Sequence, residues 1–178
     1  AAWWGSDVDT TIAARERAFK LYRDGGSNQS AAFLALELAH DHGSKMQGAN
    51  ASAWIGRARG LVADQPESVA AGHLARMLAR IALDENGDPE TALTHIDAAL
   101  RIGHEAENRD LEMLATHDRG QILMTMGLLD EGMPLMEEAM LAAASGELSP
   151  GTVGKVYCNM IAACIDTAEY DAAAQWGD

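Results

Sequence analysis

Basic residues are scarce in this sequence. Lysine and arginine total 13 against 27 aspartates and glutamates, which gives a formal net charge of −14 at pH 7. Binding to nucleic acid depends on clustered lysine and arginine beside phosphates, and anionic membrane surfaces attract the same residues. The sequence therefore predicts that this segment makes no direct contact with nucleic acid and does not bind a membrane.

Long hydrophobic runs are missing as well. No apolar stretch approaches the roughly 20 residues that a transmembrane helix needs. The first residues do not show the basic stretch and apolar run of a secretory signal peptide. Because the sequence also lacks an initiator Met, we expect it to be a fragment of a longer protein.

Cysteine occurs only twice, at Cys158 and Cys164. The two residues lie in one apolar helical pattern, about 9 Å apart at about 1.5 Å per residue, which is too far for an easy disulfide. We predict that both are reduced and buried, as expected for a cytoplasmic protein.

Aromatic residues make up only 5% of the chain, whereas Ala, Leu and Met are abundant. This composition favours helix over sheet. The chain contains four prolines, of which Pro66, Pro89 and Pro150 lie at expected helix starts, and we expect Pro134 within the first turn of its helix. These features predict an all-α protein.

Apolar residues at helical spacing, with turn and capping residues between the segments, predict nine helices. Asp88 is expected to cap one of them and Pro89 to occupy its first position. The predicted helices span residues 6–21, 31–42, 48–62, 66–84, 89–102, 108–126, 129–144, 149–166 and from Tyr170 onward.

Small residues recur along the chain at a nearly constant interval. Alanines are separated by 40, 41 and 40 residues, at Ala18, Ala58, Ala99 and Ala139. Gly87 and Gly127 lie 40 residues apart, each before a similar helix. Two helices of a hairpin approach closely only where side chains are small, and each hairpin buries one face against its neighbour.

This pattern resembles the tetratricopeptide repeat, although its period is about six residues longer than the usual 34. The resemblance covers nearly the whole chain. It implies a right-handed superhelix of antiparallel helix hairpins, a TPR-like α-solenoid with a period of about 40 residues, forming a single domain over residues 1–178. An irregular helical bundle is the alternative.

Other segments look like parts of actinobacterial LuxR-type transcription regulators, namely Ala2-Trp3-Trp4 and residues 13–22, 146–150 and 156–158. A Leu-Gly pair usually follows the two tryptophans, whereas Gly5-Ser6 follows them here. Those regulators carry a tetratricopeptide-like region beside a helix-turn-helix, and some carry a nucleotide-cyclase domain. Neither motif lies in this sequence. The resemblance implies a non-enzymatic regulatory module within a larger bacterial regulator.

No residue pattern predicts catalysis, a metal or a cofactor. His40-Asp41-His42 looks like a metal-ligand pair, but residues two apart point to different sides of a helix and no third ligand accompanies them. We interpret it as a solvated helix C-terminus, where histidine favours the helix dipole. The charge runs at Asp130-Glu131 and Glu137-Glu138 are interpreted as solvated faces.

The concave face of the superhelix is the predicted binding site. In a repeat hairpin the first helix lines this side, with inward residues every three or four places. On that register the face comprises Phe33, Leu36, His40, Leu74, Met77, Ile81, Leu114, His117, Gln121, Met124, Lys155 and Cys158. It suits a partner protein segment or a small apolar effector. The alternative is that these apolar residues form the core between layers.

A self-associating scaffold is the second functional hypothesis. Terminal repeats of a solenoid expose apolar edges that stack onto another copy. Trp3, Trp4 and Trp176 lie at these ends. This hypothesis predicts a homodimer through the terminal repeats without any ligand.

Overall fold

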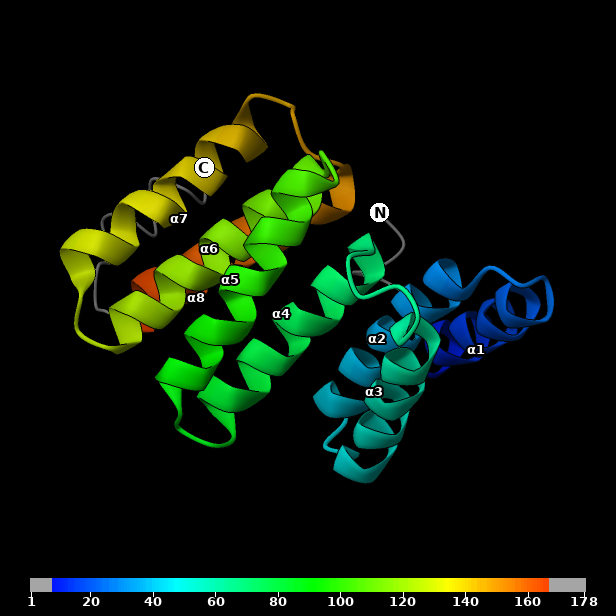
Figure 1. The fold of residues 1–178 in the computed structure, drawn as a ribbon. Helices are drawn as coiled ribbons and strands as arrows, with labels where there is room; N and C mark the ends of the chain where they lie inside the picture. The colour runs from blue at the N-terminus through cyan, green and yellow to red at the C-terminus, as the bar shows by residue number, and fades with distance from the viewer. Residues whose placement is uncertain (1–7, 167–178) are drawn as a thin grey trace. The chain divides into compact units, whose positions relative to one another are not determined.

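The computed structural model of the protein describes the backbone of residues 8–166 and the side chains of residues 8–163. Within that range it contains eight α-helices and no β-strand (Figure 1). They are α1 (Val8–Asp24), α2 (Asn28–Ser44), α3 (Gly48–Val62), α4 (Val69–Asp84), α5 (Pro89–Glu105), α6 (Arg109–Thr125), α7 (Leu129–Ala144) and α8 (Pro150–Asp166). The predicted all-α class is confirmed. The ninth predicted helix, from Tyr170, lies outside the described residues.

The observed helix ends agree with the prediction within a few residues, and α3 and α7 coincide with it. The largest differences at a start are in α2, which begins at Asn28 rather than at Ala31, and in α4, which begins at Val69 rather than at Pro66. Its first turn is capped by Ser68, whose hydroxyl oxygen accepts the N–H of Ala71 at 3.2 Å. None of the described helices is long and apolar enough to span a membrane.

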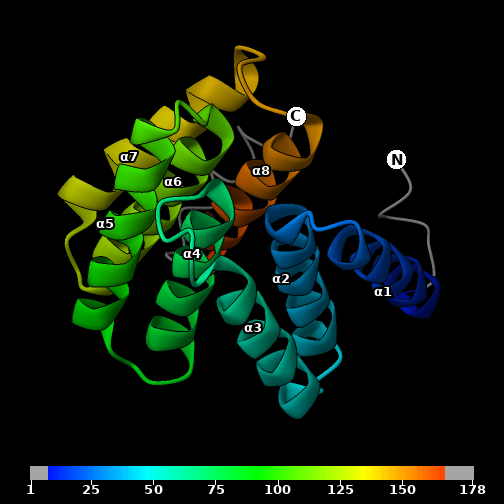
Figure 2. The same cartoon turned by 45° about the vertical axis from the view of Figure 1, so that its right-hand side comes forward.

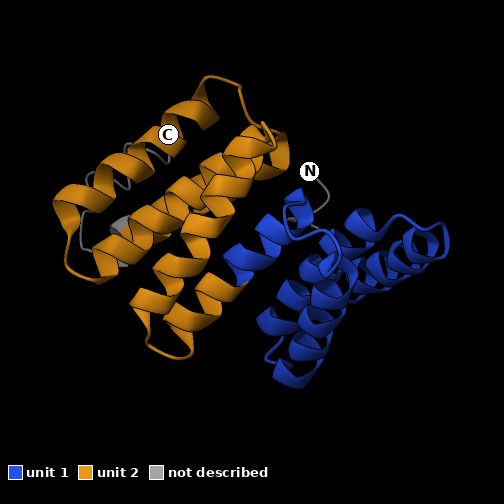
Figure 3. Ribbon diagram, in the orientation of Figure 1, with its two compact units in different colours: residues 1–77 blue, residues 78–178 orange. Residues whose placement is uncertain are grey.

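The chain falls into two compact units, residues 1–77 and residues 78–178, with the division inside α4 (Figure 3). Unit 1 contains α1 packed on α2 and the antiparallel pair of α2 and α3. Unit 2 contains the antiparallel pair of α6 and α7, with α5 packed on α6, and α8 in contact with both α6 and α7 (Figure 2). Each unit thus contains the helix hairpins that the repeat predicts.

The core of unit 1 contains packed aromatic side chains and several buried alanines. Phe19 of α1 meets Trp54 of α3 edge to face, with ring centroids 4.9 Å apart. Ala31 and Ala35 of α2 are fully buried, as is Ala58, one of the repeated alanines. Small side chains at these positions let the helices approach closely.

The core of unit 2 is rich in methionine. Its buried methionines are Met113, Met124, Met136, Met140 and Met160. The repeated alanines Ala99 and Ala139 are also fully buried in this unit, while Ala18 of unit 1 is half-buried. Flexible thioether side chains fill the irregular space that alanines and glycines leave between closely packed helices.

Helix caps fix the start of the two helices in the middle of unit 2. The Asp88 carboxylate accepts the N–H of Thr91 at 3.0 Å, and Pro89 is the first residue of α5, as predicted. Asn108 caps α6 in the same way, accepting the N–H of Leu111 at 2.9 Å. Both side chains satisfy an N–H that has no partner within its own helix.

Six of the seven turns between the described helices contain a residue with a positive φ. Gly87 and Gly127 supply it after α4 and α6, at φ 62° and 83°. Met46 and Glu107 occupy the same position after α2 and α5, at φ 59° and 50°. Non-glycine residues adopt this conformation at a steric cost. The sequence pattern did not indicate that these two turns have the same geometry.

The position predicted for Pro134 is wrong. It lies in the second turn of α7, which begins at Leu129, and not in the first turn. The predicted start of the helix at Leu129 is correct, and Pro134 is the sixth residue counted from it. Proline has no N–H to donate to the carbonyl of Asp130.

Candidate functional site

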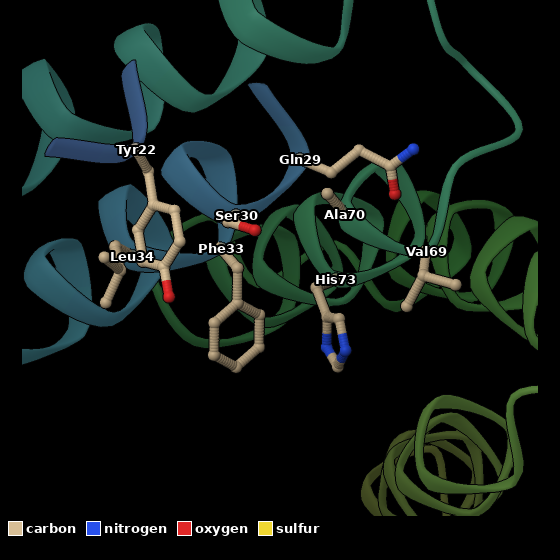
Figure 4. A pocket seen from close by; sticks show the side chains of 8 residues that line it. All are labelled: Tyr22, Gln29, Ser30, Phe33, Leu34, Val69, Ala70 and His73. Carbon is tan, nitrogen blue, oxygen red and sulfur yellow. The ribbon is translucent and has the colours of Figure 1, made fainter. Parts of the chain in front are cut away.

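A pocket of about 400 Å³ opens on the surface of unit 1 (Figure 4). Its walls come from α2, from the first turns of α4 and from the last turn of α1. The lining residues are Tyr22, Gln29, Ser30, Phe33, Leu34, Val69, Ala70 and His73. Both α2 and α4 are helices from which the sequence predicts binding residues. We refer to this feature as the α2–α4 pocket.

Two rings form one side of the α2–α4 pocket. Phe33 and His73 meet edge to face, with centroids 5.2 Å apart and an interplanar angle of 74°. Phe33 remains 41% exposed, and Tyr22, whose ring is drawn beside Leu34 in Figure 4, is 46% exposed. Seven other large apolar side chains are also exposed in the described part of the chain, among them Leu21 and Met46, but Phe33 and Tyr22 are the ones that line this pocket.

Helical spacing brings these side chains together. Ser30, Phe33 and Leu34 lie three and four residues apart on one face of α2, and Ala70 and His73 lie three apart on α4. Residues at these intervals are neighbours on a helix surface. The pocket therefore follows from two helix faces that meet, with Tyr22 added from the end of α1.

None of the described side chains that line the α2–α4 pocket carries a fixed charge. Gln29 donates its side-chain N–H to the Oε1 of Gln65 at 2.9 Å. The hydroxyl of Ser27 donates to the Oγ of Ser30 at 3.0 Å. Among the eight described residues that line the pocket, none is an aspartate, glutamate, lysine or arginine.

The formal charge of the chain is distributed unevenly between the two units. Residues 1–77 contain eight acidic and eight basic side chains, whereas residues 78–178 contain nineteen acidic and five basic ones. The whole net charge of −14 therefore belongs to unit 2. The α2–α4 pocket lies in the unit that is formally neutral.

The twelve residues predicted for the concave face have three different environments. Four are exposed, namely Phe33, His40, Lys155 and Cys158. Three are half-buried, namely Met77, Ile81 and Gln121. Five are buried, namely Leu36, Leu74, Leu114, His117 and Met124. The buried five reach a partner only if the packing of the helices changes.

Only Phe33 of the twelve lines the α2–α4 pocket. Gln121 lines a second, much smaller cavity of about 40 Å³ in unit 2, together with Asp118 and the α4 residues Arg80 and Asp84. Leu114 and Met124 belong to the methionine-rich core. On α4 the prediction is displaced by one residue. The sequence predicted Leu74 as a binding residue, but Leu74 is buried and its neighbour His73 lines the pocket.

Sequence reasoning missed Tyr22, Leu34 and His73. Tyr22 lies in the last turn of α1, a helix from which no binding residue was predicted, and the packing of α1 on α2 brings it to the pocket. The scarcity of aromatic residues was a usable signal, because Tyr22 and Phe33 are two of the five tyrosines and phenylalanines in the chain.

The interpretation of His40-Asp41-His42 as a solvated helix end is wrong for two of its residues. Asp41 and His42 are buried, and His40 is exposed. Asp41 accepts hydrogen bonds from Arg15 of α1, and the Nδ1 of His42 lies 2.6 Å from the Oε1 of Gln47. The packing of α1 on α2 covers this end of the helix. Among the described residues, no group of three or more His, Cys, Asp or Glu side chains is placed to hold a metal ion.

The burial predicted for Cys158 is also wrong, because its thiol is free and exposed. The buried residues of α8 are Thr152, Val156, Met160 and Ala163, at intervals of four and three. Cys158 is two residues from Val156 and Met160, so it points away from the face that they form. Cys164 lies outside the range of residues whose side chains the structure describes, so its predicted burial stays a prediction.

His117 has an unusual environment in the middle of α6. Its side chain is fully buried, and neither ring nitrogen has a hydrogen-bond partner among the described residues. The Asp118 carboxylate lies near it, with Nδ1 of His117 and Oδ1 of Asp118 3.9 Å apart. Met113 and Met124 lie on the same face of the helix. His117 is therefore a core residue rather than a polar point on an open surface.

Comparisons with known proteins show the fold. No family model and no curated protein matches the chain. Two solved structures from Podosopora anserina, both of kinesin light chain nearly identical TPR-like repeats, are similar to it. One, a point variant, is 16% identical, with a TM-score of 0.54 over 95% of this chain and 82% of that chain. The second is 15% identical, with a TM-score of 0.51 over 95% and 83% of the two chains. This chain therefore has a TPR-like helical-repeat fold.

Proposed function

We propose that this chain is a non-enzymatic interaction module of a larger bacterial transcription regulator, and that it binds a segment of a partner protein at the α2–α4 pocket. The observation that carries the proposal is the exposed aromatic surface of Phe33 and Tyr22 at a hollow of about 400 Å³. Exposed apolar side chains gathered at a concave place mark binding surfaces.

The fold supports this proposal. Stacked helix hairpins present extended surfaces that repeat proteins use for binding. A fold does not by itself name a function, so the site carries the argument. The regulator context rests on the resemblance of residues 2–4, 13–22, 146–150 and 156–158 to LuxR-type regulators. In that context we expect the module in the cytoplasm, with contact to nucleic acid left to another part of the parent protein.

A peptide-display experiment tests the proposal. The chain is immobilised and panned against a random twelve-residue peptide library, and enriched peptides are then measured against Phe33→Ala. We expect peptides whose binding falls at least about tenfold in the variant, which corresponds to about 1.4 kcal/mol. Enriched peptides that bind Phe33→Ala as well as the original chain overturn the proposal.

A matched control removes another exposed apolar side chain. Leu141 on α7 is 65% exposed, belongs to unit 2 and does not line the α2–α4 pocket. Leu141→Ala is expected to keep full peptide binding. Circular dichroism of both variants checks that the helices are retained. Molecular mass measured by light scattering over a range of concentrations tests the alternative, self-association. The terminal tryptophans on which that alternative rests lie outside the described residues.

A further inference from the structure

We infer that the α2–α4 pocket selects one uncharged aromatic side chain of the partner segment. This inference rests on the proposed function and adds the chemistry of the group that is recognised. Three features of the pocket carry it: its electrostatic neutrality, its aromatic walls and its open shape.

Neutrality excludes a charged side chain. None of the eight described lining residues is acidic, and none is a lysine or arginine. A carboxylate or ammonium group would find no opposite fixed charge among these residues to offset the hydration that it loses. Unit 1 as a whole has equal numbers of acidic and basic residues, so it supplies no net attraction for either sign.

Aromatic walls favour a ring over an aliphatic chain. Tyr22, Phe33 and His73 all line the pocket, and Phe33 and His73 already meet edge to face. Ring faces are electron-rich and ring edges electron-poor, so a further ring finds both kinds of surface at suitable angles. Leu34 and Val69 complete the lining with aliphatic contacts (Figure 4).

The open shape favours a side chain attached to a segment over a free small molecule. Sites for small molecules bury most of the ligand surface. The α2–α4 pocket is open to solvent, so a single small molecule would leave more of its surface in water than ligands of such sites usually do. A peptide adds contacts at the rim. The hydroxyl of Ser30, whose oxygen accepts from Ser27, has its own proton to donate to a backbone carbonyl.

Capped amino-acid amides test the inference directly. The probes are the N-acetyl amides of tryptophan, phenylalanine, leucine, glutamate and lysine, each titrated into the ¹⁵N-labelled chain and followed by NMR. We expect the tryptophan and phenylalanine amides to shift the backbone amides of Ser30, Phe33 and His73. These shifts are expected to be lost in Phe33→Ala and retained in Leu141→Ala. The glutamate and lysine amides are expected to leave the same signals unchanged.

The possible outcomes separate this inference from the proposed function. Equal shifts with the leucine amide, or shifts with a charged amide, overturn the aromatic preference. If the aromatic amides do not bind while panning yields Phe33-dependent peptides, the inference is wrong and the proposed function stands. If the aromatic amides bind but panning yields no Phe33-dependent peptide, the pocket is a small-molecule site and both proposals are wrong.

Discussion

Gly120 and Gly132 face each other where α6 crosses α7, and neither position has room for a side chain. A Cβ atom built on Gly120 lies 2.6 Å from the carbonyl oxygen of Gly132, and one built on Gly132 lies 2.5 Å from the carbonyl oxygen of Gly120. Backbone atoms cannot turn aside as the end of a flexible side chain can. The separation of these two helices therefore depends on glycine at both positions.

Substitution by alanine at either position is expected to force the helices apart. We predict that Gly120→Ala and Gly132→Ala each lower the free energy of unfolding by about 1–3 kcal/mol, as other overpacked cores do. Urea denaturation followed by circular dichroism measures this change. An unchanged midpoint for both variants would show that the crossing is wider in solution.

Gly154 of α8 provides the matched control, because a Cβ built there meets nothing within 4 Å. Gly154→Ala gains helix propensity without a clash. We therefore expect it to raise the free energy of unfolding by about 0.5–1 kcal/mol. Opposite signs of the change in unfolding free energy for Gly132→Ala and Gly154→Ala would separate the effect of steric crowding from that of helix propensity.

Much of the fold follows from local patterns in the sequence. Apolar spacing and turn residues locate all eight described helices, and the repeat interval locates buried alanines such as Ala99 and Ala139. The contact of Gly120 with Gly132 is different. It is a property of two helices crossing, and neither glycine lies at a turn or at the repeated alanine position. Spacing along one helix does not predict which residues of two helices will oppose each other.

The candidate site was harder to predict for the same reason. Phe33 was identified, but the pocket also needs Tyr22 from α1 and His73 from α4. A helix rotates by about 100° per residue, so a register error of one residue moves the predicted face from His73 to the buried Leu74. Five predicted residues are buried because an apolar stripe on a helix marks core and binding surface alike.

The cap of α5 predicts a dependence of stability on pH. Hydrogen bonds from the side chain and the backbone N–H of Thr91 hold the pKa of Asp88 below its usual value of 3.8. The folded state thus favours the carboxylate. Its contribution to stability is complete above pH 3.8 and is lost as the pH falls through the lower folded-state pKa. Asp88→Ala is therefore expected to be less stable than the original chain at pH 7, with a difference that shrinks below pH 3.8.

Asn108, the cap of α6, has no charge to titrate. Asn108→Ala is expected to lower the free energy of unfolding by about 1 kcal/mol at every pH at which the chain folds. Urea denaturation of both variants at pH 7, 5 and 3 measures the contrast. A deficit of Asp88→Ala that stays constant over this range would exclude the carboxylate as the origin of the effect.

Arg15 joins α1 to α2 through two carboxylates. It donates to Asp41 and, at 2.8 Å, to Glu37, and the side chains of all three are at least four-fifths buried. Arg15→Met removes the cation that Asp41 and Glu37 share and leaves these two carboxylates close together. We expect the free energy of unfolding to fall by about 1–3 kcal/mol, less than for a fully buried pair.

The matched control is Arg101→Met, which breaks an exposed pair with Glu105 and is expected to cost less than about 0.5 kcal/mol. Equal losses in both variants would mean that burial adds nothing to the Arg15 contacts.

His117 offers the opposite kind of test, since removing a polar group there is expected to stabilise the protein. A buried polar group without a hydrogen bond costs about 1–3 kcal/mol, and neither ring nitrogen has a partner among the described residues. His117→Leu keeps a similar volume beside Met113 and Met124, and we expect it to raise the free energy of unfolding by about 1 kcal/mol.

Thr116→Val is the control, because the Thr116 hydroxyl is buried but donates to the carbonyl of Glu112 at 2.9 Å. That carbonyl keeps its helical N–H partner in the variant, so we expect a change within about 0.5 kcal/mol. Thermal and urea unfolding of both variants decide the point: a loss of stability in His117→Leu would mean that the imidazole is hydrogen-bonded in solution.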